Sequence, residues 1–204
     1  QPVRVLCFAG TRPECLKIAP LLRQAAGDTR FDLQVVSSGQ HPHMVASTLA
    51  HLELPLSASL APVPPSTMLS LTVDHLRKQA RLFLAAQAPD VVLVQGDTST
   101  AYACALAAVD CGLPLAHLEA GLRTGNPRRP FPEEPFRRRI GSLATWHFAP
   151  TGGAAENLLA EGVHPQRVHM VGNSIVDLLR VTLEQPVAHE VPWTTLGSRL
   201  VVMT

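Results

Sequence analysis

The chain has 204 residues, of which 46% are hydrophobic and 16% are charged, and its formal net charge is +1. A chain of this length and apolar content can fold around one sizeable core. The nearly balanced charge argues against nucleic-acid or membrane-surface binding as the main function. No run of residues approaches the roughly 18–20 apolar residues of a membrane span.

Four cysteines, at positions 7, 15, 104 and 111, lack the C-x-x-C spacing that is typical of zinc sites. We therefore expect buried, reduced thiols, as in a cytoplasmic protein, and no metal site.

Short apolar runs alternate with helix-length segments along the chain. The predicted strands are residues 3–9, 32–37, 57–60 (a weak edge strand), 91–95, 114–119, 146–149 and 168–171. The predicted helices are residues 14–26, 43–51, 68–88, 99–111, 134–144, 153–161 and 174–183. Repeated β–α alternation with continuously apolar strands predicts an α/β fold, a Rossmann-like doubly wound parallel sheet with helices on both faces.

The last twenty residues differ from the rest. Residues 185–198 are loop-like, and residues 199–203 resemble the start of another strand. We therefore expect residues 1–184 to form a Rossmann-like N-terminal domain. Residues 185–204 would be a linker and the first strand of a C-terminal domain that the sequence does not include.

The predicted strand order locates the ligand site. If the weak edge strand is the third, the order 3-2-1-4-5-6 places the topological switch between strands 3–9 and 91–95. Ligands of such sheets bind at the carboxyl ends of the strands beside the switch. The loops 10–14 and 96–98 would flank that crevice, with Glu119 on the next strand.

The first loop has the features of an anion site. Gly10 permits a tight turn, and Pro13 suits the first turn of a helix. A helix N-terminus favours an anion, and Arg12 and Lys17 add positive charge, so we predict a pyrophosphate cradle. The loop lacks the Walker and G-x-G-x-x-G patterns, so NAD binding is not supported. The alternative is a capped helix with a surface pair between Glu14 and Lys17.

Two carboxylates follow buried strands. Asp97 could act on a ligand, or it could cap the next helix. Glu119 ends an apolar strand, where a carboxylate is rarely buried without a reason. A purely structural ion pair of Glu119 with Arg123 or Arg137 is the alternative.

Other polar residues stand at element ends. Glu133 and Glu134 could move protons, or they could complement the dipole of the helix that they begin. Gln40 and His41 end the second strand, where they could contact a ligand or only stabilise a turn. The arginines at 128–129 and 137–139 are expected to be solvated.

Together these segments resemble the bacterial, non-hydrolysing UDP-N-acetylglucosamine 2-epimerases. They occur in family order and span nearly all of residues 3–184. The matching segments are residues 10–14 with Lys17, 39–41, 96–98, 117–125, 132–134 with Arg137, 147–151 and 172–174. The resemblance implies two Rossmann-like domains in the glycosyltransferase-B arrangement, with the active site between them.

The resemblance also implies an activity: cytoplasmic interconversion of UDP-GlcNAc and UDP-ManNAc by a homodimer, without metal or nicotinamide cofactor. The expected route eliminates UDP, moves the proton at sugar C2 and adds UDP back. Catalytic roles are expected for Asp97, Glu119 and Glu133. Substrate binding is expected for Gly10, Arg12, Lys17, Gln40, His41 and Arg137. This chain alone is then expected to have little or no turnover.

Three alternatives stay open. One is a hydrolysing epimerase, which releases ManNAc and UDP. Another is a glycosyltransferase of the same architecture. The third is a non-catalytic module that binds a nucleotide sugar or dimerises.

Overall fold

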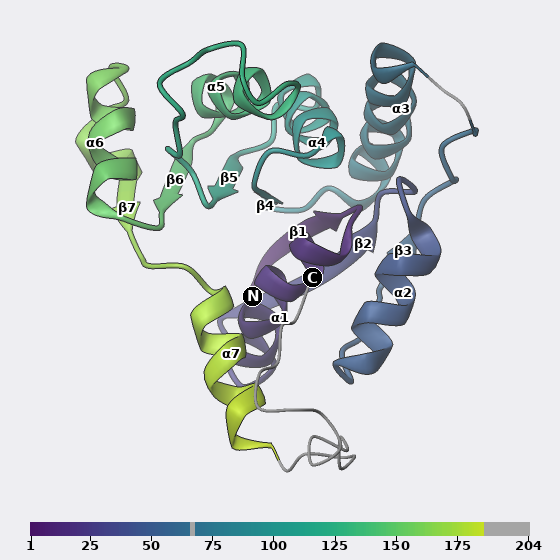
Figure 1. The fold of residues 1–204 in the computed structure, drawn as a ribbon. Coiled ribbons are helices and arrows are strands. Elements are labelled where there is room, and N and C mark those ends of the chain that lie inside the picture. Colours follow the sequence, from purple (N-terminus) through teal and green to yellow (C-terminus); the bar gives the residue numbers. More distant parts are fainter. Residues whose placement is uncertain (66–67, 186–204) are drawn as a thin grey trace, which may run out of the picture.

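A computed structural model describes residues 1–65 and 68–185, and its core is one parallel sheet (Figure 1). The strand order is β3-β2-β1-β4-β5-β6-β7, and every neighbouring pair is parallel. The strands are β1 (Val3–Ala9), β2 (Phe31–Ser37), β3 (Ala58–Ser59), β4 (Val91–Gln95), β5 (Leu115–Leu118), β6 (Trp146–Ala149) and β7 (Val168–Met170). This confirms the predicted Rossmann-like sheet and its switch between β1 and β4.

Helices cover both faces of the sheet. They are α1 (Arg12–Ala26), α2 (Pro42–His51), α3 (Leu69–Gln87), α4 (Ser99–Asp110), α5 (Glu133–Leu143), α6 (Gly152–Ala160) and α7 (Ile175–Glu184). Figure 1 shows α3, α4 and α5 on one face and α1 and α2 on the other. Helix α7 packs beside α1, and α6 packs against β6 and β7.

The central strands are buried on both sides because their alternate residues enter two different cores. In β1, Leu6 and Phe8 belong to the core beneath α3 and α4, whereas Cys7 and Ala9 belong to the core beneath α1 and α2. Side chains of a strand alternate between faces, so a doubly covered strand must be apolar throughout. This is why the continuously apolar runs predicted the fold.

The element boundaries differ from prediction at identifiable points. Helix α1 begins at Arg12 because Thr11 and Glu14 form a capping box there. Strand β5 ends before Glu119, whose φ of 65° is left-handed. The short 3-10 helix η1 (Pro165–Arg167) was not predicted. The strand predicted at 199–203 and nearly all of the linker lie outside the described residues.

Within the described ranges, no helix is long and apolar enough to cross a membrane. The same residues contain no group of three or more His, Cys, Asp or Glu side chains that could hold a metal ion. Cys7, Cys15 and Cys104 are buried free thiols, as predicted, while Cys111 is only partly buried.

Candidate active site

The loops after β1, β2 and β4 are tied together by side-chain hydrogen bonds at the carboxyl edge of the sheet. The hydroxyl of Thr98 donates to Oε1 of Glu14 over 2.6 Å. The hydroxyls of Ser38 and Thr100 lie 2.7 Å apart, and Oε1 of Gln40 accepts from the backbone N–H and the hydroxyl of Thr100. The predicted loops therefore meet at the topological switch.

Glu14 occupies the place where the sequence predicted a bound anion. Its Oε2 accepts the backbone N–H groups of Gly10 and Thr11 at 2.8 and 2.7 Å. Its side chain is 1% exposed, and burial raises its pKa above the usual range, against the lowering effect of the hydrogen bonds from Thr98, Gly10 and Thr11. These two N–H groups are therefore engaged by the chain's own carboxylate, and a pyrophosphate cradle at this loop stays a prediction that depends on Arg12, Lys17 and the helix start.

Gly10 is required for space rather than for a turn. A Cβ at this position would lie 1.9 Å from Oγ1 of Thr100 and 2.8 Å from Oγ of Ser38. Its N–H is donated to Glu14, and its part in substrate binding stays a prediction. The glycine lets the first loop pack closely against α4.

Glu119 is the centre of a second cluster, with a side chain that is 12% exposed. Its Oε2 accepts from Nζ of Lys17 at 2.5 Å and from Nε2 of Gln95. Its Oε1 accepts from Nδ2 of Asn173 at 3.0 Å. The backbone of Glu119 is left-handed, a conformation that costs a non-glycine residue about 1 kcal/mol and that is concentrated at functional sites.

The observed ion pair of Lys17 contradicts two pairings that the sequence left open, one for Lys17 and one for Glu119. The lysine pairs with Glu119 and not with Glu14. Neither Arg123 nor Arg137 is the partner of Glu119, because Arg123 pairs with Glu161 and Arg137 pairs with Asp97 and Glu134.

Asp97 belongs to a third group, in which charges alternate. An Nη2–Oδ2 contact of 2.6 Å joins Arg137 to Asp97, and Nη1 of the same arginine lies 3.4 Å from the fully buried Glu134. Arg138 also pairs with Glu134, at 3.1 Å. Thr98 caps α4, so the capping role considered for Asp97 is wrong. The expectation that arginines 137 and 138 are merely solvated is also wrong.

The remaining predicted residues lie at the same edge, and of these only Gln40 takes part in one of the clusters described above. Glu133 begins α5, and its Oε2 is buried with no hydrogen-bond partner among the described residues. Arg12 begins α1, and the exposed His41 precedes α2. The amide oxygen of Gln40 is engaged by Thr100, which leaves its Nε2 for other contacts.

Sequence reasoning did not place Gln95 and Asn173 in the site. Gln95 had a visible signal, because it is a polar residue at the end of an otherwise apolar strand. Asn173 lay in a segment that carried the family resemblance, but nothing in the sequence connected it to Glu119, 54 positions away.

His117 lies beneath the site and stays neutral. Its Nε2 donates to the carbonyl of Gly96 at 2.8 Å, and its Nδ1 has no partner in the described part of the chain. Burial lowers the pKa of His117 from 6.5 to about 4, more than the hydrogen bond to Gly96 raises it. The unfolded chain therefore binds a proton between pH 6.5 and 4 that the folded chain does not.

This difference predicts acid-sensitive stability. The contribution of His117 is fully present above pH 6.5 and is lost as the pH falls towards 4. Urea unfolding measures the free energy of unfolding at each pH. Between pH 7.5 and 5.0 this free energy should fall by about 2 kcal/mol more for the chain than for its His117→Gln variant. The amide of the glutamine can donate to Gly96 but does not titrate. Parallel pH profiles for the two proteins would contradict the prediction.

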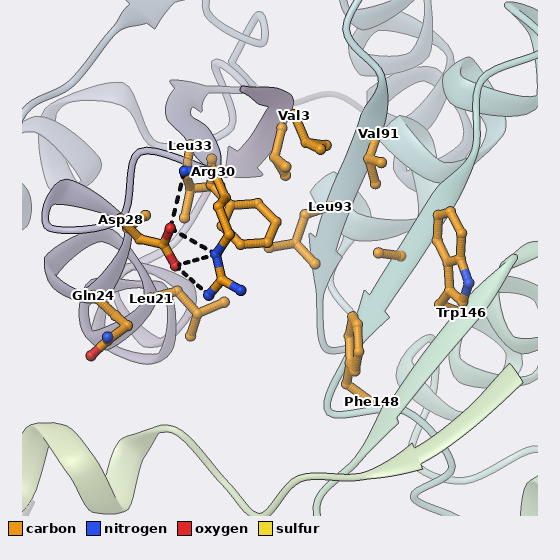
Figure 2. A pocket seen from close by; sticks show the side chains of 14 residues that line it. Val3, Leu21, Gln24, Asp28, Arg30, Leu33, Val91, Leu93, Trp146 and Phe148 are labelled. Carbon is orange, nitrogen blue, oxygen red and sulfur yellow. Dashed lines mark hydrogen bonds and ion pairs between the residues drawn. The ribbon is translucent and has the colours of Figure 1, made fainter. Parts of the chain in front are cut away.

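An apolar pocket of about 510 Å³ lies elsewhere, at the amino ends of the strands (Figure 2). Leu93, Ala116, Trp146 and Phe148 line it from the sheet, and Leu21 lines it from α1. Its charged lining residues are the paired Asp28 and Arg30. These two residues pair with each other, and no residue of the Glu14, Glu119 or Asp97 clusters lines this pocket, so we place the candidate site at the opposite edge.

Comparison with known proteins identifies the family. A family model described as UDP-N-acetylglucosamine 2-epimerase matches residues 23–204. The chain belongs to the UDP-N-acetylglucosamine 2-epimerase family. The enzyme of that name from Salmonella typhimurium is 36% identical over 211 residues, which cover 99% of this chain and 56% of the relative.

Solved structures of family members share the fold. A UDP-N-acetylglucosamine 2-epimerase structure from Listeria monocytogenes has a TM-score of 0.87 at 34% identity. The match covers 96% of this chain and 50% of the Listeria chain. The structure of the Neisseria meningitidis enzyme bound to UDP-GlcNAc has a TM-score of 0.85 at 37% identity. This match covers 89% of our chain and 50% of the Neisseria chain. The chain spans about half the length of the curated relatives that it matches.

Proposed function

We propose that this chain is the N-terminal half of an enzyme that interconverts UDP-GlcNAc and UDP-ManNAc. The observation that carries the proposal is the Glu119 cluster, a carboxylate held by Lys17, Gln95 and Asn173 at the switch point of a sheet from this family. Residues 1–184 are the Rossmann-like domain, and residues 185–204 lead into a second domain in the glycosyltransferase-B arrangement. The other side of the active site comes from that domain.

The proposed route begins at the anomeric carbon, because no carbonyl group makes the proton at C2 acidic. The bond between C1 and the phosphate oxygen breaks, and UDP leaves with the bonding electron pair. The C2 proton then moves to a carboxylate, which gives a glycal. A proton returns to the opposite face of C2, and UDP adds back at C1.

The residues divide these tasks. Arg12 and Lys17 balance the charge on the departing pyrophosphate, with Gln40, His41 and Arg137 as further contacts. An ammonium has three N–H donors, so Lys17 can donate to Glu119 and to a phosphate oxygen together. Asp97, Glu119 and Glu133 stabilise positive charge at the sugar ring and move the C2 proton. Positioned acid–base groups of this kind contribute about 10²–10⁴-fold each.

No cofactor or metal is needed for this route, since its steps are elimination, proton transfer and addition. We further propose a cytoplasmic homodimer, as the family resemblance implies. Light scattering on the full-length protein tests the dimer independently of the chemistry.

The test of the activity is the product formed from UDP-GlcNAc by the full-length protein, meaning this chain joined to the C-terminal half that its relatives have. Anion-exchange chromatography should show UDP-ManNAc approaching an equilibrium with UDP-GlcNAc. Free ManNAc and UDP in equal amounts would instead indicate a hydrolysing enzyme. Binding of UDP-GlcNAc without any product would indicate a non-catalytic module.

A further inference from the structure

The segment between β7 and α7 reaches the Glu119 cluster through one side chain, Asn173. Its Oδ1 accepts the backbone N–H of Ile175 at 3.2 Å, in the first turn of α7. A backbone N–H can only donate, so this bond fixes the orientation of the amide group. The Nδ2 group is thereby directed at Oε1 of Glu119, 3.0 Å away.

The donors of Glu119 are divided unequally between its two oxygens. Lys17 and Gln95 both donate to Oε2. Across residues 1–65 and 68–185, Asn173 is the one side chain that donates a hydrogen bond to Oε1 of Glu119. The carboxylate turns about its Cγ–Cδ bond, which moves both oxygens together, and donors on both oxygens restrain this rotation more tightly than donors on Oε2 alone.

Asn173 is itself held from both sides. The next residue, Ser174, donates its hydroxyl to the carbonyl of Lys17 at 2.6 Å, which ties the start of α7 to α1. Lys17, Glu119, Asn173 and Ser174 line one small crevice. The asparagine is therefore anchored by helix α7 and the α1 backbone, and the carboxylate takes its orientation from this anchor.

We propose that Asn173 is a positioning residue that fixes the rotation of the Glu119 carboxylate, so that the start of α7 sets the geometry of proton transfer at sugar C2. The role rests on the proposed function, because it acts through Glu119. Asn173 does not itself move a proton in this account. It holds one oxygen, and the carboxylate presents its remaining lone pairs to the substrate.

The test uses Asn173→Ala in the full-length protein. Its kcat should fall about tenfold with KM within about twofold of wild type, because the substrate contacts are intact while the carboxylate is misaligned. The split between kcat and KM is the decisive readout of this variant.

Asn157→Ala is the matched control. The Nδ2 group of Asn157 donates to the carbonyl of Gly121 at 2.9 Å, so this variant also loses one amide tie to the loop after β5, without touching Glu119. Both kcat and KM of this variant should stay within about twofold of wild type. Asn173→Asp keeps the acceptor for Ile175 but places a second carboxylate beside Glu119, so its kcat should fall about 100-fold.

The outcomes separate this role from the proposed function. Full activity of Asn173→Ala, in a protein that Glu119→Gln inactivates, would overturn the positioning role alone. Equal losses of kcat in the Asn157 and Asn173 variants, with equal falls in Tm, would also overturn it. Full activity of Glu119→Gln itself would mean that the proposed function is wrong at its central residue.

Discussion

Replacing Glu119 by glutamine is expected to lower kcat of the full-length protein by about 10²–10⁴-fold, the range of one positioned acid–base group. Glutamine keeps the size of the side chain but cannot carry a proton to or from C2. It also places an amide where Oε2 now accepts from Lys17 and Gln95. The measurement is the steady-state rate of UDP-ManNAc formation.

Glu156→Gln is the matched control for this change. Glu156 lies on the exposed side of α6, so the same chemical substitution should leave kcat unchanged. Thermal unfolding of both variants confirms that the loss is not a loss of folded protein. If the Glu119 variant keeps its turnover within about threefold, less than 0.7 kcal/mol of barrier is involved, and Glu119 has no part in the chemistry.

Replacing Arg137 by methionine should impair stability and turnover together. The variant leaves Asp97 without its 2.6 Å partner and leaves the buried Glu134 with Arg138 alone. Loss of charged contacts at buried sites costs about 2–3 kcal/mol, which urea unfolding of this chain measures. In the full-length protein, kcat should fall at least about tenfold, because Asp97 is no longer held.

Arg139→Met separates this effect from a general loss of charge on α5. Arg139 is exposed and lies two positions further along the same helix. Its replacement should change neither the free energy of unfolding nor kcat. Arg137→Lys should recover only part of the loss, since one ammonium cannot reproduce the fork that spans two carboxylates. Equal stability of the Arg137 and Arg139 variants would contradict the role given to the ion pairs.

The sheet was predictable because burial on both faces requires unbroken apolar strands. Its strand order was predicted by taking the weak edge strand as the third in a doubly wound sheet, and the structure has that order. Even the weak edge strand was recognisable, although β3 is only two residues long. The position of the site followed from the same rule, since the carboxyl ends of parallel strands meet at one edge. The structure places Asp97 and Glu119 beside that switch, as predicted.

Pairing within the site was not predictable. Arg123 and Arg137 were the partners considered for Glu119, and local spacing favoured Glu14 as the partner of Lys17. The observed pair of Lys17 and Glu119 joins residues 102 positions apart, so it depends on how the fold places the two segments in space. Glu14 was misjudged for a related reason: whether a first-turn glutamate is a surface charge or a buried cap depends on how the next loop packs over it.

The central claim is that this chain carries half of a site that moves the proton at sugar C2, and proton NMR of UDP-GlcNAc in D2O tests it most directly. With the full-length protein, we expect deuterium at C2 as UDP-ManNAc appears. With the 204-residue chain alone, we expect no deuterium at C2 and no UDP-ManNAc. UDP-ManNAc that keeps its original hydrogen at C2 would contradict the claim.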